Sequence, residues 1–255
     1  MSMKVRSIPF PKEYGSWGIL LTSCAIGIFV SGSIPWHAIA SLAGIALLFM
    51  TKAPIGIFMR RRDKASLLFT SLYTTAGIAL LLPALLRIGA GHVLALSIVP
   101  LLTIIVYAVS AYMHKERNPV VEFFAMGTLT TPVPFFYLAV QGSPGIGILA
   151  IWSFTFLYFS ASIFRVKMLI LKKKMYRRAN FVYLVATSVF VSAMIYLQSA
   201  PLIAAAAFAP LLENLVETFR HTHARSLRVI GIKELLKGVV FAFVIVISAH
   251  HTRSG

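Results

Sequence analysis

Charged residues and cysteine are scarce in this chain. Of its 255 residues only 12% are charged, whereas a soluble domain carries about 25%. The single cysteine excludes an internal disulfide and any metal cluster built on several cysteines. Hydrophobic residues reach 58%. These fractions exclude an ordinary soluble domain and a disordered chain, and they favour a membrane protein.

Acidic residues are few as well, because 7 Asp and Glu stand against 24 Lys and Arg, which gives a net charge of +17. In a soluble protein such an excess would indicate nucleic-acid binding. Beside so much apolar sequence it is typical of basic cytoplasmic loops, so we expect no nucleic-acid partner. The phosphate-binding loop of NTPases, the HExxH zinc motif and the GxSxG nucleophile motif are absent.

The apolar sequence divides into about nine segments that would cross a bilayer, since a spanning helix needs roughly 20 apolar residues. They lie near residues 16–34, 35–52, 65–87, 92–112, 119–140, 144–164, 180–198, 201–219 and 229–249. Gly, Ser and Pro separate most of them. The sequence therefore predicts an all-α, polytopic helical bundle that forms a single transmembrane domain over residues 1–255.

Loop charges give the orientation of this bundle. With a cytoplasmic N-terminus and nine spans, every basic residue except Arg87 and Arg253 falls on the cytoplasmic side. Basic loops stay in the cytoplasm because their translocation is unfavourable. We predict a cytoplasmic N-terminus, an external C-terminus and a prokaryotic-type plasma membrane.

Four of the seven carboxylates lie within predicted span ends, namely Glu122, Glu213, Glu217 and Glu234. Ionisable groups inside a span are costly and usually face a polar cavity or a charged partner. We therefore expect a polar cavity open to the cytoplasm. Glu122, Glu213 and Glu217 are the candidate catalytic acid–base residues.

A possible metal site occupies one helix face, where Glu213, Glu217 and His221 follow at intervals of four residues. Two carboxylates and an imidazole would hold a divalent cation such as Mg²⁺, with a further ligand from another span. The same residues also fit a helix end whose carboxylates pair with Arg220, Arg225 or Lys233.

Basic runs and a polar turn provide candidate contacts to an anionic headgroup. Arg61, Arg62, Lys172 and Lys173 belong to runs that either anchor loops on anionic lipid or bind a phosphate. The full set of candidate substrate-binding residues is Glu13, Arg61, Arg62, Arg117, Asn118, Lys172, Lys173 and Arg228. Asn118 is also placed to cap a helix that starts with Pro119.

The middle of the chain carries a helix-breaking signal and several scattered histidines. Pro132 and Pro134 free backbone carbonyls and predict a kink or break in the fifth span. Such a break lines a cavity in some membrane proteins and is a packed kink in others. Four histidines, at positions 37, 92, 250 and 251, are expected at the outer surface, and the cysteine, Cys24, at a packed position.

Four stretches resemble the YwiC-like integral membrane proteins. Residues 11–17, PKEYGSW, are similar to the family's opening PxEHGAW, with Tyr14 and Ser16 as departures. Residues 114–118, with Glu122 beyond them, resemble its RERS…ND turn. The region from Arg165 to 178 looks like its VRxxIRxR segment, and residues 227–234 resemble its LRxxGxxE ending. The resemblance implies no particular activity.

A more distant likeness is to the UbiA superfamily of intramembrane prenyltransferases. It rests on nine spans, a cytoplasmic N-terminus and polar loops after the second and sixth spans. Those loops bear magnesium-binding aspartates in the superfamily, but basic runs stand there in this chain, at residues 60–62 and 172–174. The likeness implies a UbiA-like bundle and, as the leading enzymatic hypothesis, a transferase.

Three functions remain open at this point. In the first, the protein binds or transforms an anionic amphiphile, such as an isoprenoid or a membrane lipid, with help from a cation. In the second, it is a secondary transporter that uses Glu213, Glu217 and Glu234 as a relay. In the third, it is an accessory membrane protein without a ligand. The external half has almost no ionisable residue, which favours the first.

Overall fold

The computed structural model describes residues 9, 11, 14–113, 118–171, 174–196, 212, 215–216 and 227–254, and a few side chains within these ranges, Arg61 and Arg228 among them, lie outside the description. All secondary structure in this part of the chain is helical, as predicted. The helices are α1 (Tyr14–Ser31), α2 (Trp36–Met50), α3 (Lys52–Arg61), α4 (Lys64–Ile88), α5 (Ala90–Tyr112), α6 (Pro119–Thr130), α7 (Pro132–Gln141), α8 (Ile146–Leu171), α9 (Lys174–Tyr196) and α11 (Leu227–Ser254).

Five helical stretches are long and apolar enough to cross a membrane. They are Trp36–Arg60, Lys64–Ile88, Ala90–Tyr112, Pro119–Gln141 and Gly147–Met168. Helix α1 is apolar but shorter, and α9 and α11, with 23 and 28 residues, have spanning length and begin with polar turns. The predicted span 201–219 falls almost wholly outside the described residues. The structure thus supports a polytopic helical membrane protein, while the count of nine stays a prediction.

The second predicted span, 35–52, covers α2, which ends at Met50. Helix α2 passes into α3 through Thr51, which keeps right-handed helical angles, and the joined stretch runs to Arg60. Pro54 does not interrupt it, because a proline in the first turn of α3 lacks only an N–H that the helix does not need there. Thr51 Oγ donates to the Leu48 carbonyl at 2.6 Å and steadies the junction.

The predicted break in the fifth span is confirmed at Thr131, between α6 and α7. Pro132 and Pro134 cannot donate to the carbonyls one turn earlier. Hydroxyls supply hydrogen bonds here: Thr131 Oγ donates to the Gly127 carbonyl at 2.9 Å, and Trp152 of α8 donates to Thr130 Oγ at 3.2 Å. The break is therefore packed within the protein.

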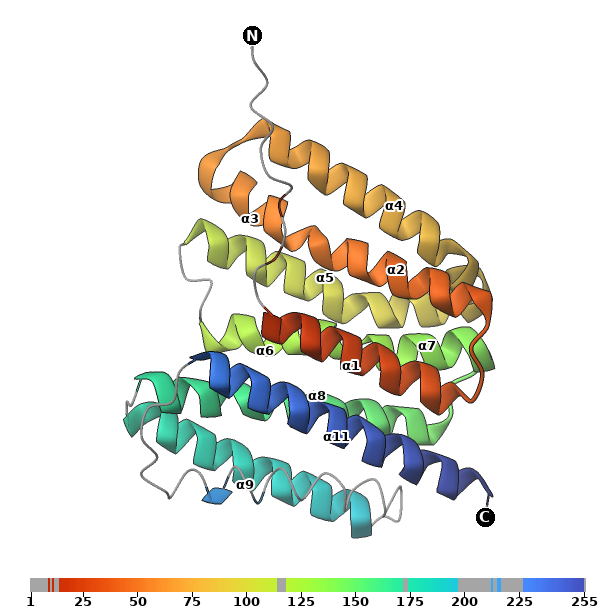
Figure 1. Ribbon diagram of the computed structural model, residues 1–255, viewed down its shortest axis with the longest axis vertical. Helices are drawn as coiled ribbons and strands as arrows, with labels where there is room; N and C mark the ends of the chain where they lie inside the picture. The colour runs from red at the N-terminus through yellow and green to blue at the C-terminus, as the bar shows by residue number, and fades with distance from the viewer. Residues whose placement is uncertain are drawn as a thin grey trace.

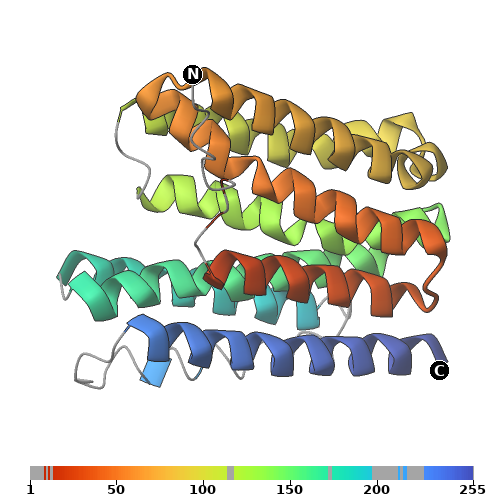
Figure 2. The same cartoon turned by 45° about the horizontal axis from the view of Figure 1, so that its top comes forward.

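The helices lie side by side along one direction, with α1, α6 and α7 between two outer groups (Figures 1 and 2). On one side α2, α4 and α7 share a buried core with α1, and on the other α8, α9 and α11 share a second core with α1. Helix α7 contributes Val133 to the second core and Phe136 to the first. Helices α1 and α7 thus join the two halves.

Glycine allows the closest helix contacts. A Cβ atom on Gly44 of α2 would lie 2.8 Å from the Gly77 carbonyl oxygen of α4, and one on Gly77 would lie 3.0 Å from the Gly44 carbonyl oxygen. A Cβ on Gly27 of α1 would lie 2.8 Å from the Pro132 carbonyl oxygen of α7. Small residues let backbones approach where lipid gives helices no hydrophobic drive to associate.

Polar side chains at the far end of α1 bond to carbonyls of neighbouring helices. Gln141 Nε2 of α7 donates to the Ser31 carbonyl at 2.7 Å. His250 Nε2 of α11 lies 3.1 Å from the Phe29 carbonyl oxygen, and His37 Nε2 of α2 lies 3.2 Å from that of Ala139. The expectation that His37 is a surface residue was wrong: it is 1% exposed because the first turn of α2 packs against α7. Cys24 is buried, as predicted.

The glycine contact between α2 and α4 gives the first test. In the Gly44→Leu variant the new side chain meets the Gly77 backbone, so we expect the free energy of unfolding to fall by about 1–3 kcal/mol. Gly91→Leu on α5 is the matched control, since no atom lies within 4 Å of its Cβ position. Unfolding in mixed detergent micelles, followed by tryptophan fluorescence, measures both. Equal losses in the two variants would contradict the close approach.

Candidate functional site

Charged side chains gather at one end of the bundle, the end where α1, α4, α6, α9 and α11 begin and α3, α5 and α8 finish (Figures 1 and 2). We call it the basic end. Its described basic residues are Lys52, Arg60, Arg62, Lys64, Arg165, Lys167, Arg177, Arg178, Lys233 and Lys237. Its described carboxylates are Asp63, Glu122 and Glu234. Positive charge therefore exceeds negative charge there.

Helix α8 supplies two cations close to its C-terminus, Arg165 and Lys167. Two residues along a helix correspond to a rotation of about 200°, so the two side chains leave on different faces. Lys167 Nζ lies 3.0 Å from Glu122 Oε1 on α6. A carboxylate in the first turn of one helix and an ammonium near the end of another also suit both helix dipoles.

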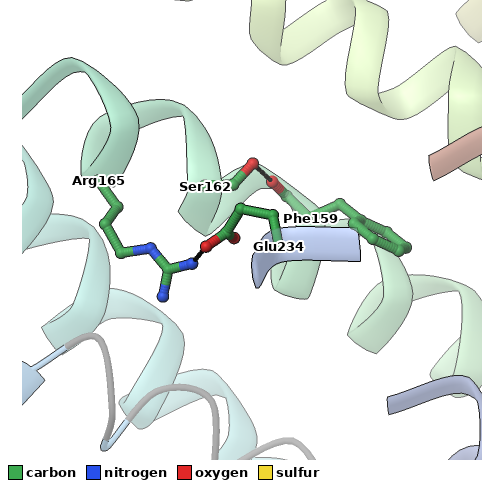
Figure 3. Close-up of polar contacts among 4 residues, drawn as sticks. All are labelled: Phe159, Ser162, Arg165 and Glu234. Carbon is green, nitrogen blue, oxygen red and sulfur yellow. Dashed lines mark hydrogen bonds and ion pairs between the residues drawn. The ribbon is translucent and has the colours of Figure 1, made fainter. Parts of the chain in front are cut away.

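Arg165 forms an ion pair with Glu234 of α11, and the two side chains point toward one another from facing helices (Figure 3). Their side chains are 6% and 25% exposed, against 12% and 34% for Lys167 and Glu122. A guanidinium this well covered is tolerated only with a charged partner, because desolvation of an unpaired ion is very costly. Four charges on three helices thus form two ion pairs on different faces of α8, and we call Arg165, Lys167, Glu122 and Glu234 together the α8 cluster.

Helix α9 carries buried polar atoms where it packs against α8. Asn180 is fully buried. One turn further on, Tyr183 donates its hydroxyl hydrogen to the Leu157 carbonyl of α8 at 2.7 Å. Sequence reasoning missed Asn180, since a single amide after a basic run gives no signal of burial. It placed Arg165 and Glu234 at the same membrane side but did not pair them.

Two short polar side chains serve as helix caps at the basic end. Asn118 Oδ1 accepts a hydrogen bond from the Val120 N–H at 3.0 Å and so caps α6, and Pro119 takes the first helical position, both as predicted. Asp63 caps α4 by accepting from the Ala65 N–H at 3.3 Å. The substrate contact predicted for Asn118 is a separate role and stays a prediction.

Arg62 ends α3 in the left-handed region, with φ 54° and ψ 30°. Among the described residues it is the one non-glycine with positive φ. The position after a helix usually takes glycine, because a Cβ is disfavoured there. Arg62 is exposed, and its guanidinium carbon lies 5.9 Å from the centre of the Phe58 ring.

Several predicted site residues lie outside the described part of the chain. They are Glu13, Arg117, Lys172, Lys173, Glu213, Glu217 and His221, together with the side chains of Arg61 and Arg228. The metal set of Glu213, Glu217 and His221 thus stays a prediction. Within the described residues, no three His, Cys, Asp or Glu side chains come together as a metal site would require.

A bundle of long apolar helices with charge held at one end defines a polytopic membrane protein of the all-helical class. A family model described as YwiC-like protein matches residues 10–137, half of the chain, and the chain belongs to this family. The match spans α1 to α7 and includes Glu122, whereas Arg165, Lys167 and Glu234 lie beyond it. No curated protein and no solved structure matches the chain. The UbiA likeness stays a prediction.

The two ion pairs differ in burial, and this difference gives the second test. Arg165→Met and Glu234→Gln should each lower the free energy of unfolding by about 3 kcal/mol, with the double variant losing less than the sum, because each single change leaves a covered charge alone. Lys167→Met and Glu122→Gln form the matched cycle, and we expect a coupling below about 1 kcal/mol for this more exposed pair. Strict additivity for Arg165 and Glu234 would show that the pair contributes nothing.

Proposed function

We propose that this protein binds an anionic amphiphile at its basic end, with the headgroup near the α8 cluster and the apolar tail along the bundle. The observation that carries the proposal is the α8 cluster itself. Ionisable residues that approach the apolar part of a membrane bundle are costly to keep and mark functional sites by default. Here a covered arginine and a lysine leave one helix for carboxylates on two others.

The charge balance favours an anion as the ligand. Glu122 and Glu234 each neutralise one cation of α8, and Lys233 and Lys237 of α11 and Arg177 of α9 add positive charge at the same end. Electrostatic complementarity then selects a negative headgroup. Arginine and lysine are the side chains that bind phosphate and carboxylate best.

The outer surface of the helices favours an amphiphile over a small water-soluble anion. Large apolar side chains are exposed along α2, α4, α5 and α11, with Leu68, Leu86, Leu94 and Phe243 among them. Such patches face lipid tails in a membrane protein. A ligand with an anionic head and a long apolar tail matches both the charge and this surface.

Binding has better support than chemical transformation. Glu122, which was predicted as a catalytic acid or base, is held in an ion pair with Lys167. Transfer chemistry would require Lys167 to release it, or the carboxylates Glu213 and Glu217 to act in its place. The transporter alternative has less support, since the threonine hydroxyls at the α6–α7 break bond within the protein.

The basic end would face the cytoplasm, as the distribution of Lys and Arg favours. In a Ser143→Cys variant the new thiol lies in the turn between α7 and α8, so an impermeant maleimide should label it on intact cells. In a Lys64→Cys variant, at the basic end, labelling should require permeabilised cells. Buried Cys24 provides an unlabelled background in both. The reverse pattern would overturn the orientation.

Native mass spectrometry of the detergent-purified protein tests the ligand class. We expect retention of phosphatidylglycerol or geranylgeranyl diphosphate over phosphatidylcholine. Lys167→Gln should lower this retention about tenfold, because it removes one positive charge and leaves Glu122 unneutralised. Lys167→Arg should retain the ligand, and Arg87→Gln, at the opposite end, is the matched control. Equal retention of the anionic lipids and phosphatidylcholine by the wild-type protein would sink the proposal.

A further inference from the structure

A second group of donors lies on the other flank of the basic end, where α3 packs against α5 (Figure 1). Lys52, Gly56 and Arg60 follow at intervals of four residues and so share one face of α3. Tyr107 of α5 lies against the middle of that face. Helix α6 stands between this seam and helix α8 in both views (Figures 1 and 2).

Gly56 makes room for the tyrosine hydroxyl. A Cβ atom on Gly56 would lie 2.9 Å from the Tyr107 hydroxyl oxygen, which is closer than real Cβ contacts, and 3.5 Å from Arg60 Nη2. The missing side chain therefore lets the hydroxyl and the guanidinium reach the same point of the α3 backbone. Gly56 itself is buried, Tyr107 is half-buried and Arg60 is exposed, so the group opens outward from a covered base.

Two cations are held on either side of this hydroxyl. Arg60 Nε donates to the Gly56 carbonyl at 3.1 Å, which fixes the guanidinium over its own helix. Lys52 Nζ lies 5.9 Å from the centre of the Tyr107 ring, on the face turned to the start of α3. The three donors lie within about 12 Å along the helix, since eight residues rise by that much. A guanidinium, an ammonium and a phenol hydroxyl around one point are donors that suit a phosphate oxyanion.

The surface beside this group is apolar. Helix α5 is the most exposed of the candidate spans, with no buried residue in its apolar window. Its exposed side chains Leu94, Ile98, Leu101, Ile105 and Val109 follow a helical stripe about 200° around the helix from Tyr107, and the exposed Ile104, one turn before Tyr107, lies between the tyrosine and this stripe. A free phosphate would make no use of these apolar side chains, whereas the acyl chains of a lipid would pass from the seam over Ile104 onto the stripe.

We propose that the seam between α3 and α5 binds the phosphate of an anionic membrane phospholipid, with the acyl chains along α5. Lys52 and Arg60 neutralise the phosphate charge, and the Tyr107 hydroxyl donates a hydrogen bond to one of its oxygens. Gly56 keeps the hydroxyl in place. This lipid site goes beyond the proposed function, because it shares no residue with the α8 cluster and does not depend on that cluster's ligand.

The test compares lipids that differ only in the headgroup. The purified full-length protein is mixed with dioleoyl phosphatidylglycerol or dioleoyl phosphatidylcholine, and retained lipid is counted by native mass spectrometry. Tyr107→Phe removes one hydroxyl and should lower phosphatidylglycerol retention about five- to tenfold, with phosphatidylcholine unchanged. Lys52→Gln and Gly56→Ala should weaken retention in the same way. Tyr112→Phe on the exposed end of α5 and Lys64→Gln on α4 are the matched controls and should behave as wild type.

Three results would overturn the site. Equal retention of phosphatidylglycerol in Tyr107→Phe and Tyr112→Phe would mean that the Tyr107 hydroxyl is not part of the site. Displacement of the lipid by millimolar inorganic phosphate would mean that the seam takes free phosphate. A Lys167→Gln/Tyr107→Phe double variant that retains as much phosphatidylglycerol as Lys167→Gln alone would assign the lipid to the α8 cluster. Arg60→Gln should weaken retention as well. If this variant melts below the wild-type temperature, Arg60→Lys, which keeps the charge, replaces it and should retain the lipid in part. If the seam site fails these tests, the ligand proposed for the α8 cluster still stands, because the Lys167 variants test it in a separate measurement.

Discussion

Hydrocarbon offers no hydrogen-bond partner, and this one constraint explains most of the structure. Every polar group that enters the bundle must find its partner inside the protein. Threonine hydroxyls return to backbone carbonyls around the α6–α7 break, and Gln141 and His250 reach carbonyls at the end of α1. Charged groups meet the same constraint more strongly. The covered Arg165 accordingly faces Glu234.

Helix α8 shows how a single helix organises a polar site in apolar surroundings. Its two cations leave on opposite faces and so reach α6 and α11, two helices far apart in the sequence. Tyr183 ties α9 to the same helix from a third direction. The site proposed for the headgroup is thus assembled around α8, whereas the lipid seam depends on α3 and α5. One end of the bundle offers two separate arrangements of positive charge.

Local features of the fold follow from the sequence. Hydropathy located the long helices, Asn118 and Pro119 marked the start of α6, and Pro132 with Pro134 marked its break. These features depend on neighbours within one turn. The passage of α2 into α3 carried no such signal, since Pro54 lies in the first turn of α3, where a proline does not break a helix.

Contacts between helices could not be derived in the same way. Whether His37 faces α7 or solvent depends on the rotation of α2, and whether Arg165 meets Glu234 or another carboxylate depends on which helices are neighbours. Gly56 carries no local signal, since its role exists only opposite Tyr107. The burial of Asn180 likewise depends on which face of α9 packs against α8. The carboxylates at 213 and 217 lie outside the described residues, so their part in the site remains a prediction.

The position of α1 between the two cores has a consequence for biosynthesis. Helix α1 emerges first but packs against α7, about 100 residues later, and against α11, about 200 residues later. At the usual pace of about 5–20 residues per second, a ribosome needs roughly 10–40 s to make that last partner. During this interval α1 lacks the second core, which α8, α9 and α11 complete. A membrane insertase or chaperone that shelters α1 would shorten its exposure to lipid, and slow translation before α11 would lengthen it.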